Sequence, residues 1–179
     1  MLLTPPLCHE RDFLYSAHEL TLEPLPMARL SDLPQSLAAH MRTLALPTFE
    51  DRPFAHGPDV RKRRVALIST AGLSRRDDDR FTLSDAGYRV LSGELGASDL
   101  VMSHISVNYD RTGFQEDVNV VFPIDRLHEL ADQGTIGSVA EYHYSFMGAL
   151  DPEQMKPHAQ ALAGHLHADG VDAVILAPV

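Results

Sequence analysis

The sequence predicts an α/β protein, built on an open and mostly parallel sheet with helices on both faces. Three observations predict it. Short apolar runs of strand length alternate with helical stretches from residue 64 onward, which is typical of parallel sheets. Eight of the twelve prolines fall in the first 58 residues, whereas ten of the eleven glycines lie beyond Gly57. No internal repeat interrupts this alternation. We therefore expect a three-layer, Rossmann-like domain behind an irregular, proline-rich N-terminal segment.

The first part of the chain predicts little regular structure. Residues 1–26 lack the features of a secretory signal or a transit peptide, and Met27 is an alternative start, so we expect a doubtful or disordered extension. Residues 27–63 are expected to form an irregular or helical lead-in, with one helix near residues 33–44. Pro34 is predicted in the first turn of that helix, with Asp32 or Ser31 as its cap. The α/β domain then occupies residues 64–179.

Within that domain each element follows from a local pattern. Apolar runs of strand length end in small or polar residues, and prolines and glycines mark where helices begin and end. Strands are predicted at residues 65–70, 99–104, 119–122 and 171–177, and helices from Pro123 to Gly134 and from Pro152 to about Ala168 with Asp151 as cap. Residues 139–146 fit either a strand or a helix. Gly93 and Gly96 are predicted to follow no strand, so no phosphate-binding glycine loop is expected.

Composition excludes several classes of function. The chain has 179 residues, 25 acidic and 15 basic side chains and a net charge of −10, which disfavours nucleic acid as a partner. The basic run at residues 61–64 directly precedes an apolar strand, so we expect it to be the solvated start of that strand and not a nucleic-acid-binding patch. A single cysteine, Cys8, excludes a disulfide framework and a zinc site with several thiolates. No apolar stretch approaches 18 residues, so we expect a cytoplasmic protein with no membrane partner.

Candidate binding residues follow the predicted strand ends, because sites in open α/β sheets gather beyond the carboxyl ends of strands. Ser69 and Thr70 end the first strand, and Gly72 follows them. Their hydroxyls and amides could hold a carboxylate, or they could be satisfied within the strand end. His104 ends the second strand, where its imidazole could move a proton or remain a buried, hydrogen-bonded side chain.

Further polar residues lie in the loops that follow. Tyr109 and Asp110 come after His104, and Asp110 could orient a histidine or bind a substrate ammonium. Asp117 and Asn119 would share one face if the chain is extended there. Asp125 and Arg126 open a helix, where they could be a dipole partner and its salt-bridge mate, or Arg126 could bind a carboxylate.

The densest polar cluster is formed by His143, Tyr144 and Ser145, beside an apolar wall that begins at Phe146. Side chains suited to zinc or iron are present at His104, Asp110, Asp117 and His143, but their spacing unites no pair, so no metal centre is expected.

Five segments resemble one known family. They read VALISTAGL (residues 65–73), MSHISVNYDRTGF (102–114), DVNVVFPIDRLHEL (117–130), GTIGSVAEYHYSFMG (134–148) and GVDAVILAPV (170–179). In this order and spacing they resemble the selenoprotein B family of glycine, sarcosine, betaine and D-proline reductases. The resemblance covers nearly two-thirds of the chain, and the segments FPIDRL and HYSFMG carry most of its specificity.

The resemblance implies an oxidoreductase subunit that reductively cleaves a carbon–nitrogen bond of an amino acid or betaine-type substrate. It implies a selenocysteine directly after Val179, followed by a resolving cysteine, and a pyruvoyl group on a partner subunit. A selenol is ionised at neutral pH, where an ordinary thiol mostly is not. Because UGA also encodes a stop, we expect the sequence to be truncated there and inactive as written. Cys8 is not expected to substitute for the missing nucleophile.

The resemblance also favours a site role for His143, Tyr144 and Ser145, and lets His104 stabilise a selenolate. The expected partners are a small-molecule amine substrate, a pyruvoyl-containing reductase subunit and a thiol–disulfide reductant, and the sequence leaves open whether the chain forms a homo-oligomer. The alternative is a non-catalytic small-molecule-binding or scaffold domain with the same fold.

Overall fold

The computed structural model describes residues 29–44, 48, 54–106 and 111–179, and the chain divides into two compact units, residues 1–46 and 47–179. In the first unit, a 3₁₀ turn, η1 (Leu30–Asp32), precedes helix α1 (Gln35–Thr43), which confirms the predicted helix. Its predicted cap is wrong. Pro34 is itself the N-cap and its carbonyl accepts the N–H of Ala38, whereas Asp32 accepts the N–H of Arg29 instead. Residues 1–26 lie outside the described residues.

The second unit is built around strand β1 (Arg64–Ser69), the apolar strand predicted from residue 65. On one side β1 pairs in parallel with β7 (Ala173–Ala177). On its other side it pairs in parallel first with β5 (Ser138–Val139) and then with β6 (Tyr142–Phe146). Residues 139–146, which the sequence left undecided, are therefore strand with one interruption.

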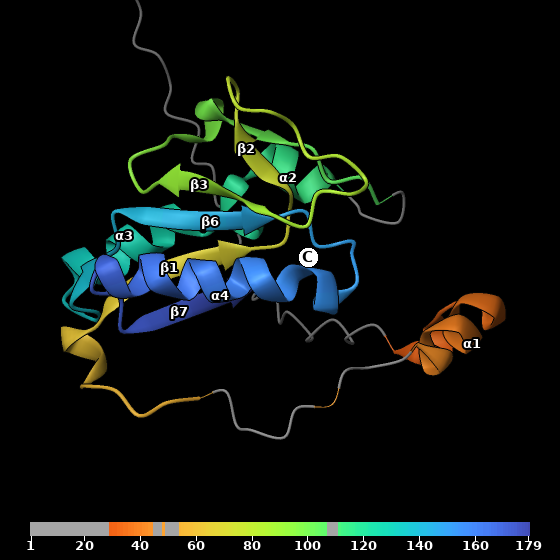
Figure 1. The fold of residues 1–179 in the computed structure, drawn as a ribbon, viewed down its shortest axis with the longest axis horizontal. Coiled ribbons are helices and arrows are strands. Elements are labelled where there is room, and N and C mark those ends of the chain that lie inside the picture. Colours follow the sequence, from red (N-terminus) through yellow and green to blue (C-terminus); the bar gives the residue numbers. More distant parts are fainter. Residues whose placement is uncertain (1–28, 45–47, 49–53, 107–110) are drawn as a thin grey trace, which may run out of the picture. The chain divides into compact units, whose positions relative to one another are not determined.

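One further strand makes the sheet mixed. Strand β3 (Tyr88–Ser92) runs antiparallel to β6 at the edge of the sheet (Figure 1). The α/β class is confirmed, and the three-layer, Rossmann-like arrangement stays a prediction. The expectation that Gly93 follows no strand is wrong, because Gly93 directly follows β3.

Two predicted strands have a different structure. Residues 99–104 contain the short strand β4 (Leu100–Met102), but it pairs antiparallel with β2 (Leu73–Arg75) in a separate two-stranded sheet. Residues 119–122 form no strand, because the 3₁₀ turn η4 (Val118–Val120) begins there. The carboxylate of Asp117 accepts the N–H of Asn119 and so caps this turn, a local bond that competes with strand pairing.

Short elements connect these strands. They are the 3₁₀ turns η2 (Val60–Lys62) and η3 (Ala97–Asp99) and the single-turn helix α2 (Thr112–Glu116).

The two longer helices of this unit form where proline and glycine predict them. Helix α3 (Ile124–Asp132) follows Pro123 and ends before Gly134, whose φ of 69° is in the left-handed region. Helix α4 (Pro152–Ala168) begins with Asp151 as its cap, since that carboxylate accepts the N–H of Glu153 at 3.0 Å. None of the helices in the described ranges is long and apolar enough to cross a membrane.

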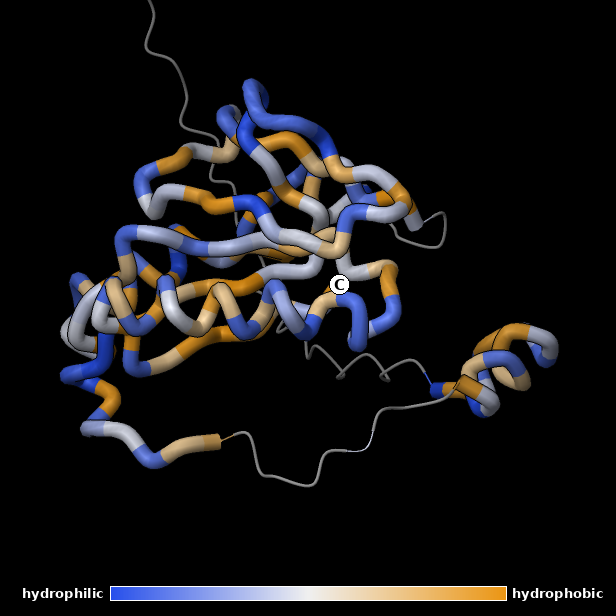
Figure 2. Tube along the Cα trace, viewed as in Figure 1, coloured by the Kyte–Doolittle hydropathy of each residue, from blue (hydrophilic) through white to orange (hydrophobic). Residues whose placement is uncertain are grey.

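The helices cover different faces of β1, which is hydrophobic along most of its length (Figure 2). Leu67 belongs to a buried cluster with Phe122 and with Leu127 of α3. Ile68 packs against a second cluster that contains Phe146 and Leu162 of α4. Because neighbouring residues of a strand point to opposite faces, these two clusters lie on opposite sides of the sheet.

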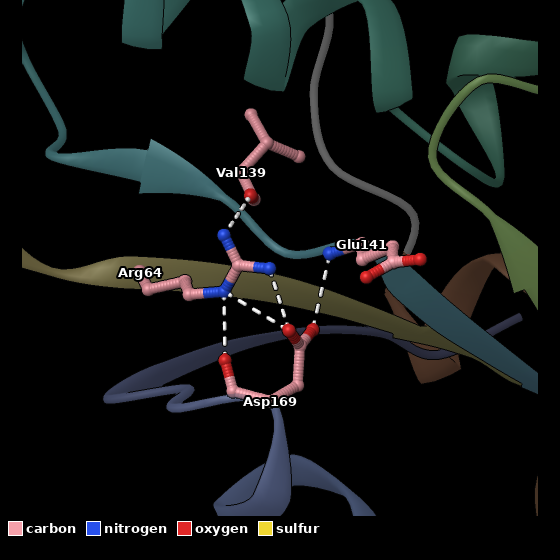
Figure 3. A network of polar contacts seen from close by, with 4 residues as sticks. All are labelled: Arg64, Val139, Glu141 and Asp169. Carbon is pink, nitrogen blue, oxygen red and sulfur yellow. Dashed lines mark hydrogen bonds and ion pairs between the residues drawn. The ribbon is translucent and has the colours of Figure 1, made fainter.

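Arg64 joins the start of β1 to the end of α4 (Figure 3). Its Nη2 lies 2.5 Å from Oδ1 of Asp169, and its Nε donates to the Asp169 carbonyl at 2.8 Å. Its Nη1 donates to the Val139 carbonyl at 2.9 Å. The other carboxylate oxygen of Asp169 accepts the N–H of Glu141 at 3.0 Å. One guanidinium thus connects β1, β5 and the turn into β7.

Candidate functional site

The carboxyl ends of β1, β6 and β7 meet at one edge of the sheet, which we call the carboxyl edge (Figure 1). The N–H of Thr70 donates to the carbonyl of Ala177 at 3.2 Å, and the N–H of Val179 donates to Oγ1 of Thr70 at 2.9 Å. The N–H of Gly72 donates to the carbonyl of Phe146 at 2.8 Å. The structure therefore brings the predicted residues Ser69, Thr70, Gly72 and Ser145 to one place.

The two serines at this edge are bonded within the fold. The Ser69 hydroxyl donates to the carbonyl of Val121 at 2.8 Å and accepts the N–H of Ala71 at 3.2 Å. The Ser145 hydroxyl accepts the N–H of Leu73 at 2.9 Å. Both side chains are fully buried. Their hydroxyls position the turn between β1 and β2 and so support the geometry of the site, while their predicted role in substrate binding stays a prediction.

Two glycines allow the backbones at the carboxyl edge to approach closely. At Gly148, whose φ is 81°, a Cβ would lie 2.7 Å from the carbonyl oxygen of Thr70. At Gly72, whose φ is 65°, a Cβ would lie 2.9 Å from the backbone nitrogen of His104. Both positions combine a left-handed backbone with no space for a side chain. The sequence did not lead us to predict Gly148 as part of the site. The signal that could have found it is a glycine placed just after a strand-forming segment.

His104 reaches the same edge from the second sheet. The N–H of Ser103 donates to the carbonyl of Gly72 at 2.9 Å, which places the following residue beside the turn. His104 is 6% exposed, and its Nδ1 accepts the N–H of Ser106 at 3.2 Å. Burial, and secondarily the charge of Arg111, lower the pKa of His104 below 6.5. The ring is therefore neutral at pH 7, and its proton is assigned to Nε2 because Nδ1 accepts a bond.

Arg111 is a candidate that sequence reasoning missed. Its guanidinium donates to the carbonyl of His104 and, at 3.2 Å, to that of Ser106. A partly buried guanidinium beside a neutral imidazole suits an anionic group, because both present hydrogen-bond donors. The available signal was a lone arginine directly after Asp110. Tyr109 and Asp110 themselves lie outside the described residues.

His143, Tyr144 and Ser145 lie in three different surroundings. Neighbouring residues of β6 point to opposite faces, so Tyr144 faces away from the other two. Only Ser145 lies at the carboxyl edge. His143 is fully buried between β1 and β6, where its Nδ1 accepts the N–H of Leu67 at 2.9 Å. Tyr144 packs edge-on against Tyr88 on the face covered by α4, with ring centroids 5.5 Å apart.

The environment of His143 keeps it uncharged. Burial lowers its pKa from 6.5 to about 4, with a smaller contribution from the charge of His128. Its ring stands edge-on to Phe122, and its Nε2 has no hydrogen-bond partner within the described part of the chain. The contacts found for this ring are those of a buried structural residue. The catalytic role predicted for His143 stays a prediction.

Asp117, Asn119 and Asp125 form a separate polar network where η4 meets α3. The Asn119 amide donates to both carboxylates at 2.8 Å, and its oxygen accepts the N–H of Asp125 at 3.1 Å. Hydrogen bonds from Asn119 lower the pKa of Asp117. Asp117 and Asn119 were expected on one face of an extended segment; they meet instead because the chain turns. The salt-bridge partner of Arg126 is Glu129, at 2.8 Å, and not Asp125.

Within the described ranges, no three metal-ligating side chains gather closely enough to hold an ion. At the carboxyl edge a guanidinium lies near a neutral imidazole whose Nε2 is buried, and these are residue types that can bind an anion and transfer a proton. The catalytic role predicted for His104 stays a prediction.

Comparison with known proteins gives a consistent family. Residues 38–179 match the family model of glycine/sarcosine/betaine reductase selenoprotein B. The chain is 33% identical over 121 residues to D-proline reductase subunit gamma of Acetoanaerobium sticklandii, which covers 66% of this chain and 49% of that protein. It is 30% identical over 139 residues to glycine reductase complex component B subunit gamma of Carboxydothermus hydrogenoformans, covering 74% and 32% of the two chains.

A third relative is sarcosine reductase complex component B subunit beta of Peptoclostridium acidaminophilum, 32% identical over 125 residues that cover 66% of this chain and 28% of that one. The chain thus spans about half the length of the D-proline reductase subunit and about a third or less of the other two. No solved structure matches it.

Proposed function

The chain belongs to the glycine/sarcosine/betaine reductase selenoprotein B family, and on that premise we propose that it forms part of a reductase subunit acting at the carboxyl edge. The proposed substrate is an amino acid or betaine-type amine, as the names of its relatives suggest. The single observation that carries this proposal is that the family match includes every segment meeting at this edge.

The proposed reaction is the reductive cleavage of a carbon–nitrogen bond. The bond between nitrogen and the α-carbon breaks, and the carbon and the nitrogen each gain a hydrogen. The nitrogen leaves as ammonia or an amine when the substrate is acyclic, and it stays in the product as a free amino group when the substrate is the ring of proline. The two electrons come from a dithiol, which is oxidised to a disulfide. The proposed partners are therefore the amine substrate, a thiol–disulfide reductant and a further reductase subunit bearing a pyruvoyl group.

A selenol–thiol pair, as the family resemblance implies, would supply the nucleophile and the resolving thiol of this reaction. The chain's own residues suit such an anion. Arg111 brings a positive charge beside His104, and the neutral imidazole of His104 carries a donor proton on Nε2. We propose that Arg111 stabilises negative charge and that His104 delivers or accepts the proton that accompanies cleavage.

Thr70, Gly72 and Gly148 have a positioning role in this proposal. Their backbones bring the ends of β1, β6 and β7 into contact, so a small displacement at either glycine would move the edge against His104. Geometry of this kind affects rate strongly even though none of these three residues reacts.

One observation favours the alternative of a non-catalytic binding or scaffold domain. The polar side chains of Ser69, Ser145 and His143 are all bonded to the backbone of the fold. If Arg111 serves only to hold the carbonyls of His104 and Ser106, the domain would bind or assemble without taking part in cleavage.

The test is a reductase assay on the protein purified with its natural partners from its native host. Glycine, sarcosine, betaine and D-proline are each supplied with a dithiol, and the reduced product of carbon–nitrogen cleavage is followed by mass spectrometry. The proposal predicts one preferred substrate, cleaved with one disulfide formed per carbon–nitrogen bond broken, and selenium in the purified complex. Absence of cleavage for all four amines, from a complex that contains this chain, would contradict the proposed reaction and leave the scaffold alternative.

A further inference from the structure

A cavity of about 360 Å³ lies at the opposite end of β6 from the carboxyl edge. Its volume is in the range of roughly 300–1,000 Å³ found for small-molecule sites. It is formed by the start of β6, a residue of β3 and the last turn of α4. The residues that line it are Val90, Glu141, Tyr142, Tyr144, His165, Ala168 and Asp169. It contains none of the residues at the carboxyl edge, so it is a separate site.

The charge of this cavity is negative. Two carboxylates line it, those of Glu141 and Asp169, but the ion pair with Arg64 compensates that of Asp169 (Figure 3). Throughout the described part of the chain, no cationic side chain lies within ion-pair distance of Glu141. The C-terminal end of α4, at Ala168, adds the partial negative charge of the helix dipole. The cavity therefore favours a cation over an anion.

The walls of the cavity are aromatic and apolar. Tyr142 and Tyr144 are two residues apart on β6 and so point to the same face. Tyr142 is 42% exposed, and Val90, opposite Tyr144 in the β3–β6 pairing, is 46% exposed. A hydrogen bond to Glu141, together with its charge, raises the pKa of Tyr142, so the one uncompensated carboxylate is held beside a tyrosine ring.

We propose that this cavity binds a small organic cation with an alkylated ammonium head. Tyrosine rings attract such a cation through their faces, while Val90 and the ring edges accommodate its alkyl groups. A bare metal ion would meet too few oxygen ligands here, because only Glu141 has an uncompensated charge. This site is independent of the proposed reductase chemistry.

The probe for this proposal is tetramethylammonium, titrated onto the protein as isolated and followed by saturation-transfer NMR of its methyl protons. The neutral isostere tert-butanol and sodium chloride at equal ionic strength are the matched controls. We expect saturable, millimolar binding of tetramethylammonium and no saturable binding of tert-butanol. Equal binding of the two compounds would overturn the proposal, because it would show that the cavity recognises only shape and apolar surface.

Two variants and one control locate the site. Glu141→Gln keeps an acceptor for Tyr142 but removes the charge, and Tyr142→Leu removes the ring but keeps an apolar side chain. Each is expected to raise the Kd for tetramethylammonium by about fivefold or more. Glu153→Gln, at the other end of α4 and paired only with Lys156 at 3.9 Å, is expected to leave the Kd unchanged. Unchanged binding in both Glu141→Gln and Tyr142→Leu, with the circular dichroism spectrum intact, would contradict this location.

Discussion

His143 occupies a position where a side chain replaces one backbone hydrogen bond of the sheet. Strand β5 leaves β1 after Val139, and β6 joins it at Tyr144, opposite Ile68. In the gap, the N–H of Leu67 has no carbonyl partner and donates instead to Nδ1 of His143. A buried N–H without an acceptor would cost about 1–3 kcal/mol, so this ring stabilises the junction of the two strands.

Protonation of His143 should therefore destabilise the protein. Its pKa is about 4 in the folded state and 6.5 in the unfolded state, so between these values only the unfolded chain gains the proton. Through His143 alone, the free energy of unfolding should be highest above pH 6.5 and fall by about 1.4 kcal/mol per pH unit down to about pH 4. His104, whose pKa is also lowered, adds to this fall in the same direction. Urea unfolding at several pH values measures this slope.

The variant that isolates this effect is His143→Asn, whose side-chain oxygen can still accept the N–H of Leu67 but cannot titrate. It should be less stable than the original protein at pH 7, because it leaves a small cavity, and its slope between pH 6.5 and 4 should be clearly smaller. His158→Asn, an exposed change on α4, is the matched control and should keep the original slope. The same slope in all three proteins would disprove the role given to His143.

For single residues, the sequence predicted the place along a strand better than the environment of the side chain. Ser69, Thr70 and Gly72 were correctly expected at one strand end. The signal was an apolar run that stops at small polar residues and is followed by a glycine, which is typical of a strand that leads into a turn. His143 and Ser145 looked equivalent, yet one fills a gap between strands and the other lies at the edge. That difference depends on the pairing of β1 with β6, which no local pattern contains.

Among the elements, the approach of β5 to β1 depends on a glycine. At Gly137 a Cβ would lie 2.5 Å from the backbone carbon and 2.8 Å from the carbonyl oxygen of Lys62. Gly137→Ala should therefore force the two segments apart and lower the free energy of unfolding by about 3 kcal/mol. Thermal and urea unfolding measure the loss.

Gly164 is the matched control for this change. It lies inside α4, and nothing in the structure is within 4 Å of a Cβ placed there. Gly164→Ala should raise the free energy of unfolding by about 0.5–1 kcal/mol, because alanine loses less backbone freedom on helix formation. If the two alanine variants were equally stable, the close approach of β5 and β1 would be wrong.

The Arg64 network makes a second prediction about the elements. Lysine at this position could not bond at once to the Val139 carbonyl, the Asp169 carbonyl and the Asp169 carboxylate, because only a guanidinium has donors in several directions. Arg64→Lys should cost about 2 kcal/mol of unfolding free energy. Arg126→Lys, in an exposed pair with Glu129, should change it by less than about 0.5 kcal/mol. Equal effects of the two changes would contradict the network.

Helices whose ends carry a capping aspartate, a proline or a glycine could be predicted from the sequence. Elements without such residues at their ends could not. Asp151 with Pro152 correctly marked the start of α4, and Gly134 the end of α3. The apolar residues at 119–122 suggested a strand, but the carboxylate of Asp117 caps a 3₁₀ turn there. Strands β2 and β3 were missed because they are short and only partly apolar, and long-range pairing stabilises them.

For the whole molecule, the alternation of strands and helices correctly indicated the α/β class. It could not show that β3 runs antiparallel or that β2 and β4 form a sheet of their own, because strand direction depends on partners distant in sequence. The family assignment depends on residues 38–179 as a set, whereas the site depends on how that set folds. Arg111 illustrates the difference. No motif in the sequence marks it as a site residue, and its hydrogen bond to the carbonyl of His104 is seen only in the folded structure.

The central claim is that the carboxyl edge, through His104, takes part in cleavage. The most direct measurement is kcat of the purified reductase complex carrying His104→Asn, whose oxygen can still accept the N–H of Ser106 but which lacks Nε2. We predict a loss of about 100-fold in kcat with normal assembly, since positioned proton transfer contributes at least that much. His158→Asn should show the original rate. Full turnover in a correctly assembled His104→Asn complex would contradict the account and assign this edge a structural role.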